Sequence, residues 1–114
     1  MEYKTGIVEF TNETPNGTSQ TVKLGYVKSG KVVTLHILQM VLTPKQINTA
    51  IALNGTLPEE LRPAGNRFFS SVLCSNGSII GTARISISAN GTINYISSCP
   101  DIQDMYFTAT YIAL

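Results

Sequence analysis

The sequence predicts an all-β fold, an antiparallel β-sandwich or jelly roll of about eight strands. Apolar and polar residues alternate with a period of two along nearly every segment, which is the pattern of a half-buried strand. The connections between these segments are short and polar. Asn-Gly, the preferred central pair of a tight hairpin turn, occurs at residues 16, 54, 76 and 90. The 114 residues have room for one domain with a single core, spanning residues 1–114.

The first three strands are predicted in the N-terminal part of the chain. Tyr3–Phe10 alternates and is followed by the polar loop TNETPNGTSQ. Thr21–Lys28 alternates up to the turn at Ser29-Gly30. Lys31–Leu42 (KVVTLHILQMVL) is the longest apolar run and is apolar on both faces. We therefore expect this third strand to take part in a subunit interface.

The segment Gln46–Leu53 fits two kinds of secondary structure. Thr43-Pro44 is typical of an N-cap followed by Pro at the first helical position, and residues 47, 50 and 51 fit one face of a helix. Residues 47, 49, 51 and 53 fit one face of a strand equally well. We favour the strand, because the segment is too short to form a stable helix.

The C-terminal half begins with a loop, NGTLPEELRPAGN, whose two prolines and two glycines interrupt regular structure. We interpret this loop as scaffold, with Leu57 and Leu61 packed inward and Arg62 hydrogen-bonded to loop carbonyls. Four strands follow, at residues 67–74, 78–88, 91–98 and 104–114. We interpret Asn90-Gly91 as a type I′ turn. The sequons that overlap Asn-Gly are interpreted as turns rather than glycosylation sites, because the N-terminus has no apolar block typical of a signal peptide.

The composition excludes several classes of partner. The formal net charge is +1, which provides no basic surface for nucleic acid and no polybasic patch for a membrane. No apolar stretch approaches the roughly 20 residues of a membrane-spanning helix, so we expect no membrane insertion. Charged residues make up only 13% of the chain, about half of the usual share of roughly 25%. This shortage of charge predicts that part of the surface is covered by other copies or by a partner.

The residues that carry catalysis or bind metals do not form a recognisable constellation. The single histidine, His36, lies in the most apolar run, where we expect a partly buried residue at a strand or subunit contact. Asp101 and Asp104 flank a turn, but two carboxylates are weak evidence for calcium. Cys74 and Cys99 lack the spacing of a zinc site, and both a disulfide and two buried thiols remain open. The sequence therefore predicts a protein that is not an enzyme and has no cofactor or metal.

A small group of residues is the best candidate for ligand binding. Most aromatic residues lie within predicted strands and are expected in the core or in subunit contacts. A minority can form a platform on which sugar rings stack, where an aromatic face cooperates with polar side chains. We predict such a group at Tyr95 with Asn94, next to Arg84 on the facing strand. The expected ligand is a glycan or another surface receptor.

Four stretches resemble a known family in their order and spacing. They are YVKSGKVVTLHI, TLPEELRP, GSIIGTARISISANGTINYI and MYFTATYIAL. Together they resemble the C-terminal head modules of bacteriophage tail-fibre and baseplate receptor-binding proteins. In those modules a Lys-x-Gly-x-Val-Val-Thr-Leu strand leads to a Leu-Pro-x-x-x-Arg-Pro loop, an I-x-I-x-x-x-Gly-x-I hairpin and an aromatic strand that ends in Thr-Tyr. The resemblance covers about three-quarters of the chain, and residues 1–20 lie outside it.

The resemblance implies a β-sandwich head, usually a homotrimer, that attaches a virion to a glycan or protein receptor on the host cell. Its location would be the virion, after assembly in the host cytoplasm. We expect residues 1–20 to form either an edge strand or a connection to a shaft. The subunit contact is expected at Val33, Leu35, His36, Ile37 and Tyr111. The alternatives are a carbohydrate-binding or adhesin module of a cellular protein, and a structural virion decoration without a receptor.

Overall fold

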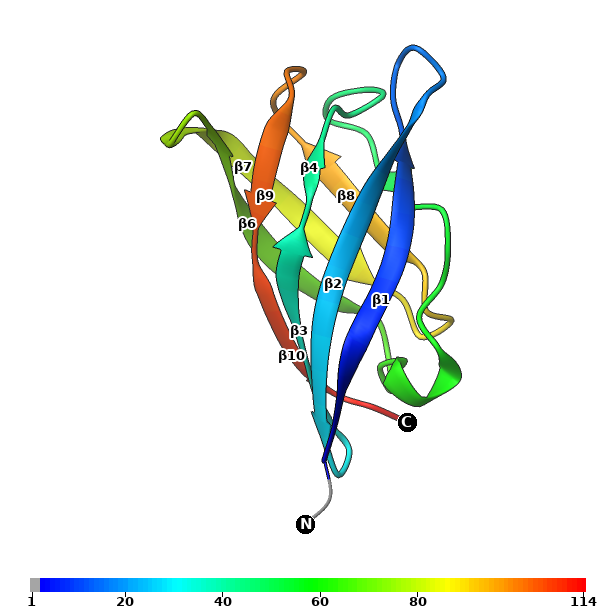
Figure 1. Cartoon of the computed structure of the whole chain (residues 1–114). Helices are drawn as coiled ribbons and strands as arrows, with labels where there is room; N and C mark the ends of the chain where they lie inside the picture. The colour runs from blue at the N-terminus through cyan, green and yellow to red at the C-terminus, as the bar shows by residue number, and fades with distance from the viewer. Residues whose placement is uncertain (1–2) are drawn as a thin grey trace.

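The computed structural model, which describes residues 3–114, is an all-β sandwich and confirms the predicted fold class. Two antiparallel sheets pack face to face (Figure 1). The four-stranded sheet has the order β1 (Tyr3–Glu13), β2 (Ser19–Ser29), β3 (Val32–Gln39) and β10 (Thr108–Ile112). The six-stranded sheet has the order β4 (Val41–Leu42), β9 (Gln103–Tyr106), β6 (Arg67–Ser75), β7 (Ser78–Ile87), β8 (Ile93–Ser97) and β5 (Ile51–Ala52).

The eight expected strands become ten in the described residues because two of them pass from one sheet to the other. The run 31–42 bends at Met40 between β3 and β4, and the run 104–114 bends at Phe107 between β9 and β10. Both residues at the bends are buried, at 2% and 8% exposure. Strands that switch sheets in this way form the corner of a sandwich, where an apolar side chain fills the angle between the layers.

The connection between β4 and β6 is less regular than we expected. Only Ile51–Ala52 of the predicted strand Gln46–Leu53 forms a strand, β5, and Asn48 adopts a left-handed conformation with φ of 54°. The proline-rich loop contains a short 3₁₀ helix, η1 (Glu59–Leu61). Its role as scaffold is confirmed: Leu57 and Leu61 are fully buried, and Arg62 Nε donates a hydrogen bond to the Leu57 carbonyl at 3.0 Å.

The two sheets are joined by an apolar core and by a buried polar network at one end. The core consists of inward-facing residues from both sheets, among them Phe10, Leu24, Leu35, Ile85 and Ile93. In the network, the Tyr95 hydroxyl of β8 donates to Asn12 Oδ1 of β1. The Asn12 amide in turn donates to the carbonyl of Thr43 at 3.0 Å and to Gln20 Oε1 at 3.1 Å. Buried polar groups are tolerated when they are paired in this way.

The turn at Asn90-Gly91 differs from the predicted type I′ turn. The amide of Ser88 donates to the carbonyl of Thr92 at 2.9 Å, so the loop contains three residues, 89–91. Gly91 has φ of 89°, whereas Asn90 does not have a positive φ. The type I′ conformation is instead found at Asn76-Gly77, where both φ values are positive, at 51° and 80°.

Residues 3–20 contribute an edge strand to the four-stranded sheet, and residues 1 and 2 of the segment 1–20 lie outside the described residues. Residues 3–20 form β1 and the start of β2, and β1 lies at the edge of the four-stranded sheet, as one of the two expectations stated. Asn54 covers the C-terminal part of this edge by pairing with Thr11.

Candidate functional site

The candidate site is a shallow depression on the outer face of the six-stranded sheet. Its volume is about 450 Å³. Alternate residues of neighbouring strands form its floor, since Ser70 of β6 lies opposite Arg84 of β7, which lies opposite Ile96 of β8. The lining residues are Asn48, Ser70, Thr82, Ala83, Arg84, Ile96 and Ser98.

Arg84 and Phe68 give the site its most distinctive pair of side chains. The guanidinium carbon of Arg84 lies 5.3 Å from the centroid of the Phe68 ring, within cation–π distance. Both side chains are outward-facing, and Phe68 is 61% exposed, so much of its ring remains accessible. The pair therefore places a positive group beside an open aromatic surface.

The rest of the depression is uncharged and combines polar side chains with the apolar Ala83 and Ile96. Ser98 Oγ donates to the carbonyl of Thr82 at 3.2 Å, which fixes its hydroxyl at one side. Asn48 is held beside β8 by its backbone amide, which donates to the carbonyl of Ser97 at 2.8 Å. Arg84 is the only ionisable residue of the lining, so the site favours ligands that present hydroxyls or a negative charge.

The structure separates the three residues that we predicted to bind a glycan. Arg84 lines the depression, and Asn94 lies on the same face, opposite Ser86. The prediction for Tyr95 is wrong: its side chain is fully buried and lies opposite Ile85, on the inner face of the sheet. Burial raises the pKa of Tyr95 to about 12, and the hydrogen bond to Asn12 opposes this rise.

Three of the residues expected at a subunit interface belong to the chain's own core. Val33 and Leu35 have no exposed surface, and Tyr111 is 4% exposed, so none of them reaches a surface that another copy could contact. The Tyr111 hydroxyl donates to the Leu61 carbonyl at 2.6 Å, and burial raises the pKa of this phenol. The apolar run that suggested an interface is covered by the second sheet of the same chain.

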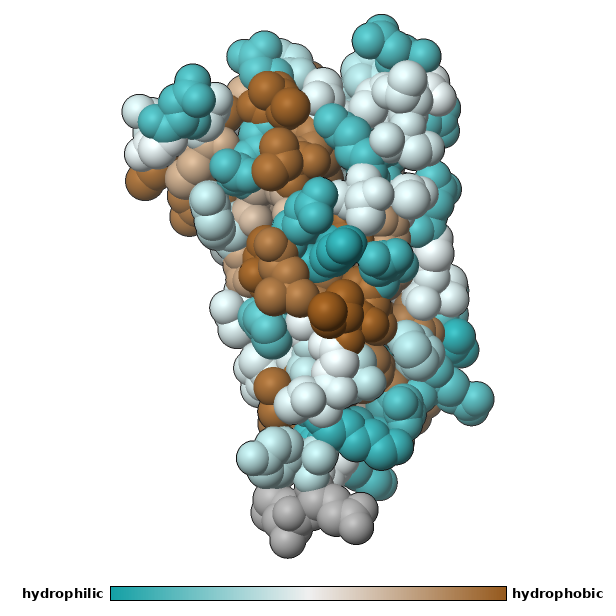
Figure 2. Space-filling view, viewed as in Figure 1, coloured by the Kyte–Doolittle hydropathy of each residue, from teal (hydrophilic) through white to brown (hydrophobic). Residues whose placement is uncertain are grey.

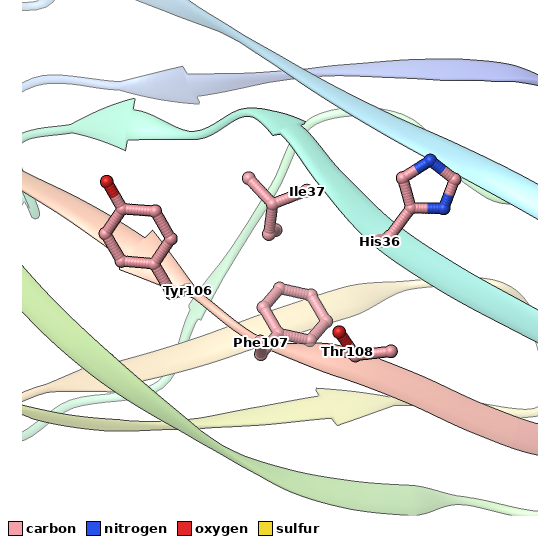
Figure 3. Close-up of a pocket in the computed structure, with 5 residues that line it drawn as sticks. All are labelled: His36, Ile37, Tyr106, Phe107 and Thr108. Atoms are coloured by element: carbon pink, nitrogen blue, oxygen red, sulfur yellow. The ribbon is translucent and has the colours of Figure 1, made fainter.

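His36 and Ile37, the other two of these residues, line a second hollow of about 400 Å³ (Figure 3). It lies at the corner where the β3–β10 pair of one sheet continues into the β4–β9 pair of the other, and Tyr106, Phe107 and Thr108 complete its lining. His36 and Tyr106 stand at opposite ends of this hollow, with Ile37 and Phe107 between them (Figure 3). His36 is partly buried at a strand contact, as expected: a Cβ at Gly25 would lie 2.2 Å from its Nε2.

Sequence reasoning missed most of the polar lining and the aromatic ring of the depression. Phe68 and Ser70 alternate along β6, and Thr82 and Arg84 alternate along β7, so each strand carried part of the signal. The two strands could be combined only with their register. Asn48 and Ser98 reach the site from outside regular strands, and period-two alternation gives no signal for such residues.

The remaining surface provides apolar side chains in separate groups. Figure 2 shows hydrophobic side chains along the edge on which β3, β4 and β9 lie, with hydrophilic side chains between them. Leu38 and Val41 there are 50% and 42% exposed. In residues 3–114, no three His, Cys, Asp or Glu side chains gather as metal ligands, and both cysteines are free. Among the described residues η1 is the only helix, and it is too short to span a membrane.

Comparisons with known proteins leave the structure as the main guide to function. No protein-family model matches the sequence, and no curated protein matches it.

Proposed function

We propose that this chain is the head domain of a viral fibre or tail protein and that it attaches the virion to a glycan on the host cell without catalysing a reaction. The observation that carries the proposal is the depression at Arg84, where a guanidinium, hydroxyls and an amide lie beside an exposed aromatic ring. Sugars are bound by this combination, because a ring stacks on the sugar's apolar face while polar groups bind its hydroxyls. The resemblance to phage receptor-binding heads supports the viral setting.

The charge of the site favours an acidic sugar. Arg84 is the only ionisable group of the lining, and its planar fork matches a carboxylate with two parallel hydrogen bonds. Ser70 and Thr82 line the same depression and supply hydroxyls for neighbouring sugar hydroxyls, and Phe68 has its exposed ring at the side. A glycan that carries a carboxylate would use all of these groups at once.

Assembly into a homotrimer is the second part of the proposal. It is supported by the low content of charged residues and by exposed apolar side chains along β3 and β4, among them Val32, Leu38 and Val41. Sedimentation equilibrium tests this part. A molecular mass of three chains or of a multiple of three is expected, and a protein that sediments without any three-fold species would contradict it.

Glycan binding is tested with an array of neutral and acidic host-surface sugars, followed by titration of the best ligand. Arg84→Ala removes a charge-assisted pair, so the dissociation constant is expected to rise by about ten- to a hundredfold. Arg67→Ala is the matched control, since Arg67 is exposed outside the depression and bonds only the Asn66 carbonyl. An array without any binding, or equal affinities for the two variants, would overturn the proposal.

A further inference from the structure

We propose that the free edge of β1 pairs with the same edge of a second copy, so that two four-stranded sheets become one continuous sheet. The pairing is antiparallel, its two-fold axis passes through Thr5, and it involves Tyr3–Ile7 of each copy. This contact is independent of glycan binding and of three-fold assembly, because it uses neither the depression nor β3 and β4.

The hydrogen bonds of the hairpin determine which backbone groups of β1 are free. The backbone amide of Thr14 donates to the carbonyl of Thr18 across the hairpin at 2.8 Å. The backbone amides and carbonyls of even-numbered residues of β1 therefore point toward β2. Thr11 bonds in the opposite direction: its amide and carbonyl both pair with Asn54, at 3.1 Å and 2.8 Å. Because the pattern alternates along an antiparallel strand, the amides and carbonyls of odd-numbered residues point away from β2.

The free part of the edge is limited to Tyr3, Thr5 and Ile7. Among the described residues, no backbone partner outside the β1–β2 ladder reaches these three. Further along, Glu9 is screened by the loop, because a Cβ at Gly55 would lie 3.5 Å from its carbonyl oxygen. An edge strand with unpaired groups is a template for another strand.

This short edge is complementary to itself. With the axis at Thr5, Tyr3 lies opposite Ile7 of the second copy, Ile7 lies opposite Tyr3 of that copy, and the two Thr5 residues lie opposite each other. All of these residues have free amides and carbonyls, so each opposed pair exchanges two hydrogen bonds. A two-fold axis placed further along β1 would require Glu9 to pair with the second copy, and the loop at Gly55 screens the Glu9 backbone. The structure therefore accommodates the axis at Thr5.

The side chains support a second copy as the occupant. Tyr3 and Ile7 point to the outer face and are 69% and 60% exposed, and an aromatic residue opposite a β-branched one is a favourable cross-strand pair. Lysine often protects an edge, but Lys4 points to the inner side, where it pairs with Glu60 at 3.2 Å. In the proposed register Lys4 faces Gly6, so no like charges are opposed.

Sedimentation of the intact chain and of Thr5→Pro tests the contact. Within the described residues of one copy the Thr5 amide has no partner, so proline removes only the hydrogen bond to the second copy and its ring occupies the edge. We expect the mass of the wild-type species to be halved by this substitution, whatever three-fold contacts are present. Equal masses for the two proteins, or a wild-type protein without paired species at sub-millimolar concentration, would overturn the proposal.

A second variant covers the case in which Thr5→Pro fails to fold. Ile7→Lys places a charge opposite Tyr3 of the second copy and should also halve the mass. Ile112→Lys is its matched control, because Ile112 lies on the same outer face with 50% exposure but on the opposite edge strand. Loss of pairing in both lysine variants would indicate a general effect of apolar surface and would contradict the edge contact.

Amide hydrogen exchange gives an independent readout in the wild-type protein. Protection of the Thr5 and Ile7 amides should increase with protein concentration, because these groups become bonded only in the pair. The Thr11 amide serves as an internal reference, since its bond to Asn54 exists within one copy. Concentration-independent exchange at Thr5 and Ile7 would rule out the proposed register.

Discussion

Two loops of the six-stranded sheet contain the same dipeptide and adopt different conformations. Asn76-Gly77 joins β6 to β7 as a two-residue type I′ turn with both φ values positive. Asn90-Gly91 joins β7 to β8 within a three-residue loop in which only the glycine has a positive φ. The difference shows that the turn dipeptide does not by itself select the register of the strands that it connects.

The pattern of apolar residues explains why the loops differ. Ile85 and Ile87 of β7 and Ile93 and Tyr95 of β8 are all odd-numbered and all buried, so odd residues must face odd residues across the two strands. A two-residue turn at 90–91 would place odd residues opposite even ones and expose half of this set. The three-residue loop gives the required register.

The β6–β7 hairpin reaches the same result by another route. Its two-residue turn pairs Ser75 with Ser78, which opposes odd and even residues. The register shifts between Leu73 and Cys74, so that Leu73 lies opposite Gly81 and odd residues face each other from there onward. A bulge therefore brings odd residues opposite odd residues in the β6–β7 hairpin, and an extra loop residue does so in the β7–β8 hairpin.

The largest expected effect comes from placing a charged side chain on the buried face of β8. Ile93→Asp places a carboxylate in the core and removes a fully buried side chain, so the free energy of unfolding should fall by more than about 4 kcal/mol. Ile96→Asp changes the outer face next to Arg84 and should cost less than about 1 kcal/mol. Urea denaturation of both variants measures the difference. Similar losses in the two would show that β8 has another register.

The strands were predicted from the sequence largely because the core pattern is strong. Alternation located all of the long strands, and it also identified Arg84 as outward-facing. The sheet changes at Met40 and Phe107 were not predicted, since both residues continue apolar runs and nothing local marks a bend. A second sheet of the same chain and a neighbouring subunit require the same apolar side chains, which is why Val33 and Leu35 were assigned to an interface.

A surface position for Tyr95 agrees with the register of a type I′ turn but not with the alternation of apolar residues. A type I′ turn at Asn90-Gly91 would place Tyr95 opposite Ser86 and diagonal to Arg84, as a surface platform requires. The observed loop shifts β8 by one residue and turns Tyr95 into the core. Ile93 and Tyr95 alternate in step with Ile85 and Ile87, so the sequence held the correct signal. Ser70 and Phe68 were missed because their position relative to Arg84 depends on the bulge at Ile80 of β7.

A smaller effect distinguishes the two glycines. Gly77→Ala is expected to cost about 1 kcal/mol, because φ is 80° and no atom lies within 4 Å of the added carbon. Gly91→Ala should cost about 3 kcal/mol, since the same strain is joined by contacts of 2.9 Å with Arg62 Nε and the Leu57 carbonyl oxygen. Thermal and chemical denaturation give both values. Equal costs would mean that the loop at Gly91 relaxes away from Leu57.

The smallest effect is expected where the dipeptide and the core pattern are brought into agreement. Deleting Ala89 leaves Asn90-Gly91 as a two-residue loop between Ser88 and Thr92, which already face each other. Asparagine and glycine both adopt positive φ readily, so a type I′ turn can form while Ile87 stays opposite Ile93. The lost hydrogen bond from the Ala89 amide to Asn66 is exposed, and the free energy of unfolding should change by less than about 1 kcal/mol.

Cross-strand NOEs provide the decisive measurement for this deletion. If the core pattern sets the register, the variant retains the NOEs between Ile87 and Ile93 and between Ile85 and Tyr95, and its stability is close to that of the wild type. If the length of the three-residue loop dominated instead, residues 90–92 would form the loop, the strand would slip, contacts between Ile87 and Asn94 would replace them, and Tyr95 would lose its bond to Asn12. The tyrosine hydroxyl therefore reports on the outcome directly, because only the inward register brings it to the Asn12 side chain across the core.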